Sequence, residues 1–262
     1  MSNTPPMHLV AHRGNAHEFP ENTLPAFESA LALGLRCLEL DVQLSADGVP
    51  VVIHDHRLER TAAIPGTVFE LRASELARLD ACEPERFGER FRGTHIPLLR
   101  EVLGLLDGRP DITLFVEIKR ASLGQFGVDR VVTRVLETLK PVRAQCVVIS
   151  FDLAAVYRAR QISGGPIGWV LSDYDTHSRL KYETLQPEYL FCDHEKLPAS
   201  GALWRGPWHW AVYEISTMSL ALALAKRGVE YIETMCVSQM SQAMRGMPGA
   251  VLPPGAALPP SP

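Results

Sequence analysis

The chain has 262 residues, of which 46% are hydrophobic and 21% are charged, and its formal net charge at pH 7 is -4. This length suits a single α/β barrel of about 250 residues, and this composition excludes a globally disordered chain. A weakly acidic chain is also atypical of nucleic-acid-binding proteins, so we expect no nucleic-acid partner.

Cysteine usage and hydropathy exclude several further classes. The five cysteines include no Cys-x-x-Cys pair, which argues against a disulfide framework and against a zinc site built from cysteines. The amino-terminal segment does not resemble a secretory signal, and no stretch approaches the roughly 20 apolar residues of a membrane span. We therefore expect a cytoplasmic protein without a transmembrane segment. The sequence does not define the oligomeric state, and a homodimer is compatible with it.

Strands and helices alternate along most of the chain. Strands are predicted at His8–Gly14, Cys37–Gln43, Thr113–Lys119, Cys146–Phe151, Ile167–Leu171, Tyr189–Asp193, Trp210–Ile215 and Tyr231–Thr234. Helices are predicted after Thr23, which suits an N-cap, and at Leu98–Leu106, Val128–Leu139, Leu153–Gln161 and Ser219–Arg227. Eight strands with right-handed helical crossovers predict an α/β fold, a closed TIM (β/α)8 barrel.

Two segments depart from this alternation. After the second strand, Val49–Ile53 is predicted to return as an extended segment, and residues 55–97 are predicted to form a small insertion with a short helix at Ser74–Leu79. Residues 248–262 are rich in Pro, Gly and Ala and are predicted to be a disordered tail. We therefore expect a single domain over residues 1–247, with a loose leader at residues 1–7.

Acidic side chains occupy unusual positions in two of the predicted strands. Glu39 and Asp41 alternate with leucine and valine, and Glu117 and Lys119 repeat this arrangement in TLFVEIK. Residues two apart in a strand share a face, so the acids face inward if the aliphatic side packs on helices. Buried like charges are costly unless a cation or a proton compensates them. Glu39, Asp41 and Glu117 therefore predict a site for one hard divalent metal ion, such as Mg²⁺, Ca²⁺ or Mn²⁺.

Two histidines lie at the ends of predicted extended segments. His12 follows the first strand, and His54 follows the return segment Val49–Ile53. Active sites of TIM barrels lie at the carboxyl ends of the strands, and imidazoles exchange protons near neutral pH. A single histidine beside a strand is more often structural, but two histidines and three acids at corresponding strand ends favour a catalytic site.

These motifs, taken in order, resemble the glycerophosphodiester phosphodiesterase family. The matching segments are His12-Arg13-Gly14, Glu21-Asn22-Thr23, Glu39-Leu40-Asp41, His54-Asp55 and Glu117-Ile118-Lys119. The resemblance extends from the first strand to the last and implies a TIM barrel, one divalent metal ion and two-histidine acid/base catalysis. It implies a small-molecule substrate, a glycerophosphodiester, hydrolysed to sn-glycerol 3-phosphate and an alcohol.

The resemblance also assigns expected roles to individual residues. His12 and His54 would act as the acid and base pair, exchanging roles between two half-reactions. Arg13 and Lys119 would bind the phosphate, because a guanidinium fork and a second positive charge match its oxygens.

Glu21 and Asn22 are predicted to support the site, with capping of the Thr23 helix as an equally weighted alternative. The strand beginning at Trp210 continues Ala-Val-Tyr, where the family often has Thr-Val-Asn, and the last strand reads Glu233-Thr234, where the family often has Thr-Asp. We expect Trp210 to wall the cleft, and the departures leave the leaving alcohol open.

Three alternatives remain open from the sequence. The first is cleavage of lysophospholipids, which the short insertion disfavours because it offers little material for an acyl groove. The second is a non-catalytic phosphate-binding barrel, which the complete set of histidines and acids disfavours. The third is zinc hydrolysis by the pair His54 and His56, which is disfavoured because amidohydrolase barrels carry such a pair at the end of strand one.

Overall fold

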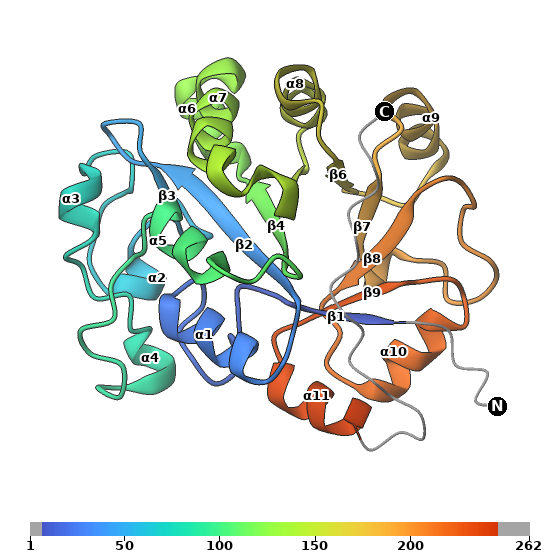
Figure 1. Cartoon of the computed structure of the whole chain (residues 1–262), viewed down its shortest axis with the longest axis horizontal. Helices are drawn as coiled ribbons and strands as arrows, with labels where there is room; N and C mark the ends of the chain where they lie inside the picture. The colour runs from blue at the N-terminus through green and yellow to red at the C-terminus, as the bar shows by residue number, and fades with distance from the viewer. Residues whose placement is uncertain (1–6, 246–262) are drawn as a thin grey trace.

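Eight parallel strands close into a barrel in the computed structural model, which describes residues 7–245 (Figure 1). These strands are β1 His8–Ala11, β2 Cys37–Leu44, β4 Thr113–Ile118, β5 Cys146–Ser150, β6 Ile167–Val170, β7 Tyr189–Asp193, β8 His209–Tyr213 and β9 Tyr231–Thr234. They pair in chain order, and β1 pairs with both β2 and β9, which closes the ring. The predicted TIM barrel is confirmed. The predicted tail at 248–262 and residues 1–6 of the predicted leader lie outside the described residues.

Helices connect the strands and pack on the outside of the barrel. They are α1 Leu24–Ala32, α5 Leu99–Leu103, α6 Arg120–Phe126, α7 Val128–Leu139, α8 Leu153–Ser163, α9 Thr176–Leu185, α10 Met218–Ala225 and α11 Val237–Arg245, with 3-10 turns η1 Gly104–Leu106, η2 Lys140–Gln145 and η3 His194–Lys196. The sequence does not predict α6, α9 and α11. In α9 the buried residues are Ser178 and Tyr182, so this helix has almost no apolar stripe to reveal it.

The first strand is shorter than predicted because the chain turns sharply after His12. Arg13 and Gly14 have φ angles of 56° and 80°, and a Cβ at Gly14 would lie 2.7 Å from the backbone of Ala26. This position therefore requires glycine. Helix α1 starts directly after Thr23, as predicted, but the Thr23 hydroxyl donates to the Pro20 carbonyl. Thr23 therefore occupies the predicted N-cap position, but its side chain makes no capping hydrogen bond because this local bond competes with it.

The predicted insertion after the second strand is confirmed and has a hydrophobic cluster of its own. It follows β3 Pro50–Val52, which pairs antiparallel with β2, and contains α2 Glu59–Ala62, α3 Ala73–Leu76 and α4 Pro84–Phe87. Its core includes Leu58, Val68, Leu76 and Ile96. The three short helices gather at the left of Figure 1, beside β3. The insertion therefore lies next to the strand end that carries His54.

Large apolar side chains fill the barrel interior. Phe115 makes edge contacts with Tyr189, Phe191 and Tyr231, with ring centroids 5.1, 5.2 and 5.8 Å apart. Because inward residues recur every second position, the next inward residue after Phe115 is Glu117, and the next after Tyr231 is Glu233. The aromatic layer thus forms the floor beneath a layer of acids.

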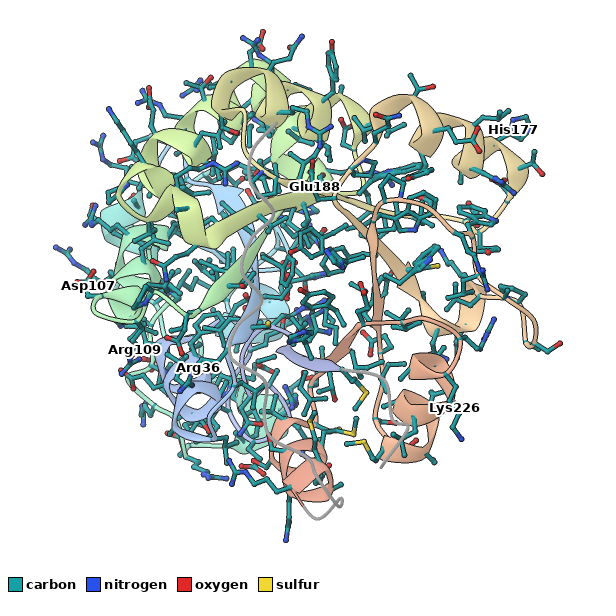
Figure 2. All side chains as sticks on the ribbon, turned by 45° about the vertical axis from the view of Figure 1, so that its right-hand side comes forward. Arg36, Asp107, Arg109, His177, Glu188 and Lys226 are labelled. Atoms are coloured by element: carbon teal, nitrogen blue, oxygen red, sulfur yellow. The ribbon has the colours of Figure 1, made fainter. Side chains whose placement is uncertain are left out.

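Charged side chains cover the outside of the barrel. Figure 2 shows Asp107 and His177 at the edge of the molecule. Within residues 7–245, no helix has the length and hydropathy required to cross a membrane.

Candidate active site

Three carboxylates from two adjacent strands meet at the carboxyl end of the barrel. Glu39 and Asp41 come from β2 and Glu117 from β4, and they are 2%, 1% and 9% exposed. One oxygen from each lies within 4.8 Å of the other two. The inward alternation predicted for both strands is therefore correct, and it brings together the three acids assigned to the metal site.

Two cationic side chains lie against this acid cluster. The Arg13 Nε lies 3.0 Å from Asp41 Oδ2, and the Lys119 Nζ lies 3.2 Å from Asp41 Oδ1 and 2.8 Å from Glu117 Oε1. The Arg13 backbone N–H also donates to Glu39 Oε2 at 3.0 Å. Burial alone would raise the pKa of Asp41, but Lys119 and Arg13 outweigh it and hold that pKa well below its usual range.

Burial outweighs the nearby positive charge at the other two acids, Glu39 and Glu117. Burial raises the pKa of Glu39 well above its usual value, and the neighbouring Asp41 and Glu233 raise it further. Burial also raises the pKa of Glu117. The Oε1 atom of Glu39 is buried and has no hydrogen-bond partner within the described residues. A cluster of oxygen atoms whose negative charge exceeds the nearby positive charge fits a hard divalent cation.

His12 lies at the centre of a group of acids. Its Nε2 is 3.3 Å from Glu233 Oε1 and 4.0 Å from Glu39 Oε2, and its Nδ1 is 3.8 Å from Glu214 Oε1. The residue is 6% exposed. Burial lowers the pKa of His12 well below its usual value, and the nearby Arg13 lowers it further. Both effects favour the neutral form of the imidazole.

His54 is held by a charged network that begins in the insertion. Its Nδ1 lies 2.6 Å from Asp55 Oδ1, and Arg60 of α2 donates from Nε to Asp55 Oδ2 at 2.6 Å. Arg60 also donates to both oxygens of Glu21, at 3.0 and 2.7 Å. Glu21 in turn accepts from Arg13 Nη1 at 3.2 Å. One arginine thus links the His54 side of the site to the Arg13 side.

Glu21 and Asn22 contact Arg13 and Asp41, and these contacts are compatible with the predicted supporting role. The Asn22 amide donates to Asp41 Oδ2 at 2.8 Å and accepts from the Asp41 backbone at 3.1 Å. Asn22 adopts a left-handed backbone with φ 58°, a conformation that asparagine tolerates better than most residues. Neither side chain is hydrogen-bonded to the start of α1, so the capping alternative is wrong.

A cavity of about 130 Å³ lies beside the acid cluster and the two histidines. Its polar wall is formed by His12, Arg13, His54, Glu117, Lys119, Glu214 and Glu233, and its apolar wall by Ile149, Phe151, Val170, Phe191 and Tyr213. The prediction that Trp210 walls the cleft is wrong. Trp210 faces the helices, where its Nε1 donates to the Trp204 carbonyl, because the inward residues of β8 are Ala211 and Tyr213.

Three polar residues at the site were not predicted from the sequence. Glu233 is an isolated acid in the apolar strand YIET, so the alternation that identified Glu39 could also have identified it. Arg60 lies in the insertion, and no local pattern marks it. Glu214 directly follows β8 with φ 63°, an uncommon conformation for glutamate that often occurs at functional sites.

The alternative zinc pair is not assembled. His56 stacks on Phe69 with ring centroids 5.6 Å apart, while His54 bonds Asp55. In the part of the chain that the structure describes, the side-chain groups close enough to share a metal ion include neither His54 nor His56.

Comparison with known proteins identifies relatives that all belong to one family. The glycerophosphoryl diester phosphodiesterase family matches residues 12–203. A glycerophosphodiester phosphodiesterase of Caldanaerobacter subterraneus subsp. tengcongensis is 42% identical over 121 residues, which cover 46% of this chain and 49% of that protein. The human glycerophosphodiester phosphodiesterase 1 is 27% identical over 188 residues, which cover 70% of this chain and 55% of that protein. The chain thus spans about half the length of these curated relatives.

Solved structures extend the similarity over nearly the whole chain. An Oleispira antarctica phosphodiesterase in complex with the product sn-glycerol-3-phosphate superposes with a TM-score of 0.80 at 25% identity, covering 91% of this chain and 97% of that one. A glycerophosphodiester phosphodiesterase from Agrobacterium tumefaciens gives a TM-score of 0.70 at 24% identity, covering 90% and 99% of the two chains. At 24% identity, the similarity to the Agrobacterium tumefaciens structure establishes the fold alone.

Proposed function

Because the chain belongs to the glycerophosphoryl diester phosphodiesterase family, we propose that it hydrolyses a glycerophosphodiester to sn-glycerol 3-phosphate and an alcohol. The observation that carries this proposal is that Arg13, Lys119, His12 and His54 line one small cavity together with Glu117, which also belongs to the three-carboxylate cluster. The product bound to the Oleispira antarctica phosphodiesterase, sn-glycerol-3-phosphate, supports the same substrate class.

Arg13 and Lys119 would bind the non-bridging oxygens of the phosphodiester. Both side chains line the cavity, and the Arg13 guanidinium is also paired with Glu21 and Asp41. A guanidinium fork and an ammonium placed at fixed positions stabilise the charge that develops on phosphorus-bound oxygens. A divalent cation held by Glu39, Asp41 and Glu117 would supply further charge neutralisation when bound.

His12 and His54 would move the protons. Asp55 engages the Nδ1 of His54, which leaves Nε2 as the nitrogen for proton transfer. His12 is more deeply buried, between Glu233 and Glu214. One imidazole would deprotonate the attacking hydroxyl while the other protonates the leaving alcohol, with the roles reversed when water completes the hydrolysis.

The dimensions of the cavity favour a small alcohol over a lysophospholipid. A cavity of about 130 Å³ is small for a fatty acyl chain, most of which would have to lie outside it. The insertion helices α2, α3 and α4 have four residues each, so they offer no long apolar groove either. A non-catalytic barrel is disfavoured because every acid and histidine of the expected set is present in the cavity or adjoins it.

The test is an assay of purified protein against glycerophosphocholine, glycerophosphoethanolamine and glycerophosphoglycerol with Mg²⁺, Ca²⁺ or Mn²⁺, with sn-glycerol 3-phosphate as the detected product. We expect turnover that EDTA abolishes and that His12→Ala and His54→Ala each reduce by about 100-fold or more. His17→Ala is the matched control, because His17 is exposed and does not line the cavity. Binding of the diester without turnover under all three metal ions would instead favour a non-catalytic barrel.

A further inference from the structure

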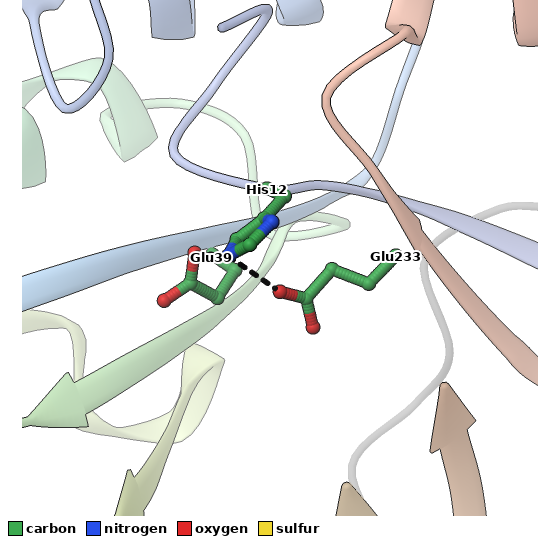
Figure 3. Close-up of side chains that lie close together, drawn as sticks. All are labelled: His12, Glu39 and Glu233. Atoms are coloured by element: carbon green, nitrogen blue, oxygen red, sulfur yellow. Dashed lines mark ion pairs between the residues drawn. The ribbon is translucent and has the colours of Figure 1, made fainter. Parts of the chain in front are cut away.

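A second group of metal-binding side chains lies beside the three-carboxylate cluster. It consists of His12, which follows β1, Glu39 on β2 and Glu233 on β9. One donor atom of each lies within 4.8 Å of the other two. Figure 3 shows the imidazole between the two carboxylates, with its ion pair to Glu233 marked. Glu39 belongs to both groups, so the two would share one ligand.

Both carboxylates of this second group are buried and incompletely satisfied. Glu39 is 2% exposed and Glu233 is 3% exposed. Glu39 Oε1 and Glu233 Oε2 have no hydrogen-bond partner within residues 7–245. A buried carboxylate oxygen without a partner is costly, and a bound cation would remove that cost.

The donor set suits a borderline cation such as Zn²⁺ better than Mg²⁺. It combines an imidazole nitrogen with carboxylate oxygens, whereas the first cluster offers oxygen atoms alone. The 3.3 Å between His12 Nε2 and Glu233 Oε1 matches two ligands that each lie about 2 Å from a common ion. Glu214 Oε1 lies 3.8 Å from the other nitrogen, Nδ1, which has no hydrogen-bond partner within residues 7–245.

We propose that His12, Glu39 and Glu233 form a second divalent-cation site, selective for Zn²⁺ over Mg²⁺, and that its occupation inhibits the enzyme. The inhibition rests on the proposed function, because it requires His12 to exchange protons during hydrolysis. An imidazole nitrogen bound to a metal ion has no free lone pair to accept a proton. The cation would therefore remove one member of the histidine pair, and it would share Glu39 with the cation of the first cluster.

Binding can be tested independently of activity. We expect equilibrium dialysis of the full chain against Zn²⁺ in a large excess of Mg²⁺ to load about one more Zn²⁺ per chain on the wild type than on Glu233→Gln. Glu230→Gln is the matched control, since Glu230 pairs with His209 away from the cavity. Equal Zn²⁺ loading of the wild type and Glu233→Gln would overturn the site.

Inhibition is measured as the Zn²⁺ concentration that halves each variant's own rate in excess Mg²⁺. We expect Glu233→Gln to need at least about tenfold more Zn²⁺ than the wild type, because even outer partners of a metal site change affinity by that factor. Glu230→Gln should match the wild type. Activation by Zn²⁺ would overturn the inhibitory site, and so would an inhibitory Zn²⁺ concentration that is the same for Glu233→Gln and the wild type. Neither result would contradict the proposed hydrolase activity. A complete lack of turnover with every diester would contradict the proposed function instead, and the dialysis result would still stand.

A measurement on the wild type alone covers the case in which Glu233→Gln does not fold. X-ray absorption at the zinc edge of the Zn²⁺-loaded, Mg²⁺-saturated protein should show one imidazole ligand among oxygens. An all-oxygen shell would overturn the assignment of His12 as a ligand.

Discussion

Arg60 offers the sharpest test of how the insertion serves the barrel. Its guanidinium donates to Asp55, which holds His54, and to Glu21, which holds Arg13. Replacing it by alanine removes the shared anchor of both side chains without touching the cavity itself, because Arg60 does not line it. Arg60→Ala should therefore impair catalysis more than it impairs folding.

The magnitude follows from the contacts that are lost. Arg60 makes one bond to Asp55 at 2.6 Å and two bonds to Glu21 at 2.7 and 3.0 Å. Its side chain is 42% exposed, so solvent screening reduces the loss in free energy of unfolding to about 1–2 kcal/mol. Small displacements of catalytic groups are more costly, and we expect kcat to fall about 10- to 100-fold, or about 1.4–2.7 kcal/mol in activation free energy.

The assay compares steady-state kinetics on glycerophosphocholine with urea unfolding for three variants. Arg60→Lys retains the charge but not the fork, so its kcat should lie between those of the wild type and Arg60→Ala. Arg57→Ala is the matched control, because Arg57 pairs with Glu59 at the surface and its side chain is 64% exposed. It should change both quantities by less than about 0.5 kcal/mol.

Two results would refute the role of Arg60 in positioning. One is an Arg60→Ala enzyme with wild-type kcat. The other is a loss of kcat that Arg57→Ala reproduces, since that would reflect general loosening of the insertion.

Three further predictions concern the metal site and the core. The pKa values of Glu39 and Glu233 are raised in the folded protein, so without metal the folded chain binds protons more tightly than the unfolded chain does. The free energy of unfolding in EDTA should therefore fall as pH rises above the unfolded pKa of about 4.3, and Mg²⁺ should flatten that slope in unfolding curves. Asn22→Gly keeps the left-handed backbone but removes the hydrogen bond to Asp41. Titration calorimetry should therefore show metal binding weakened about 10- to 100-fold, and an unchanged metal affinity would refute this prediction. Phe115→Ala should cost about 3–5 kcal/mol in urea unfolding, because Phe115 is fully buried in the barrel floor, and a cost near that of a surface change would contradict the packing.

The sequence by itself was sufficient to predict the fold and most of the acid cluster. Alternation along a strand is a local property, so the inward direction of Glu39, Asp41 and Glu117 follows from two short segments. Alternation of strands and helices likewise predicts the barrel, because few other topologies satisfy the handedness of the crossovers. The ordered motifs also identified Glu21 and Asn22, which contact Arg13 and Asp41.

Only the tertiary structure decided which distant side chains meet. Glu233 approaches His12 because β9 pairs with β1, and that pairing exists only once the barrel closes. Arg60 reaches Glu21 across 39 positions of the chain through a short insertion helix. Trp210 faces the helices because the register of β8 turns Ala211 and Tyr213 inward. Closure and register depend on packing of the whole chain, so no local pattern contains them.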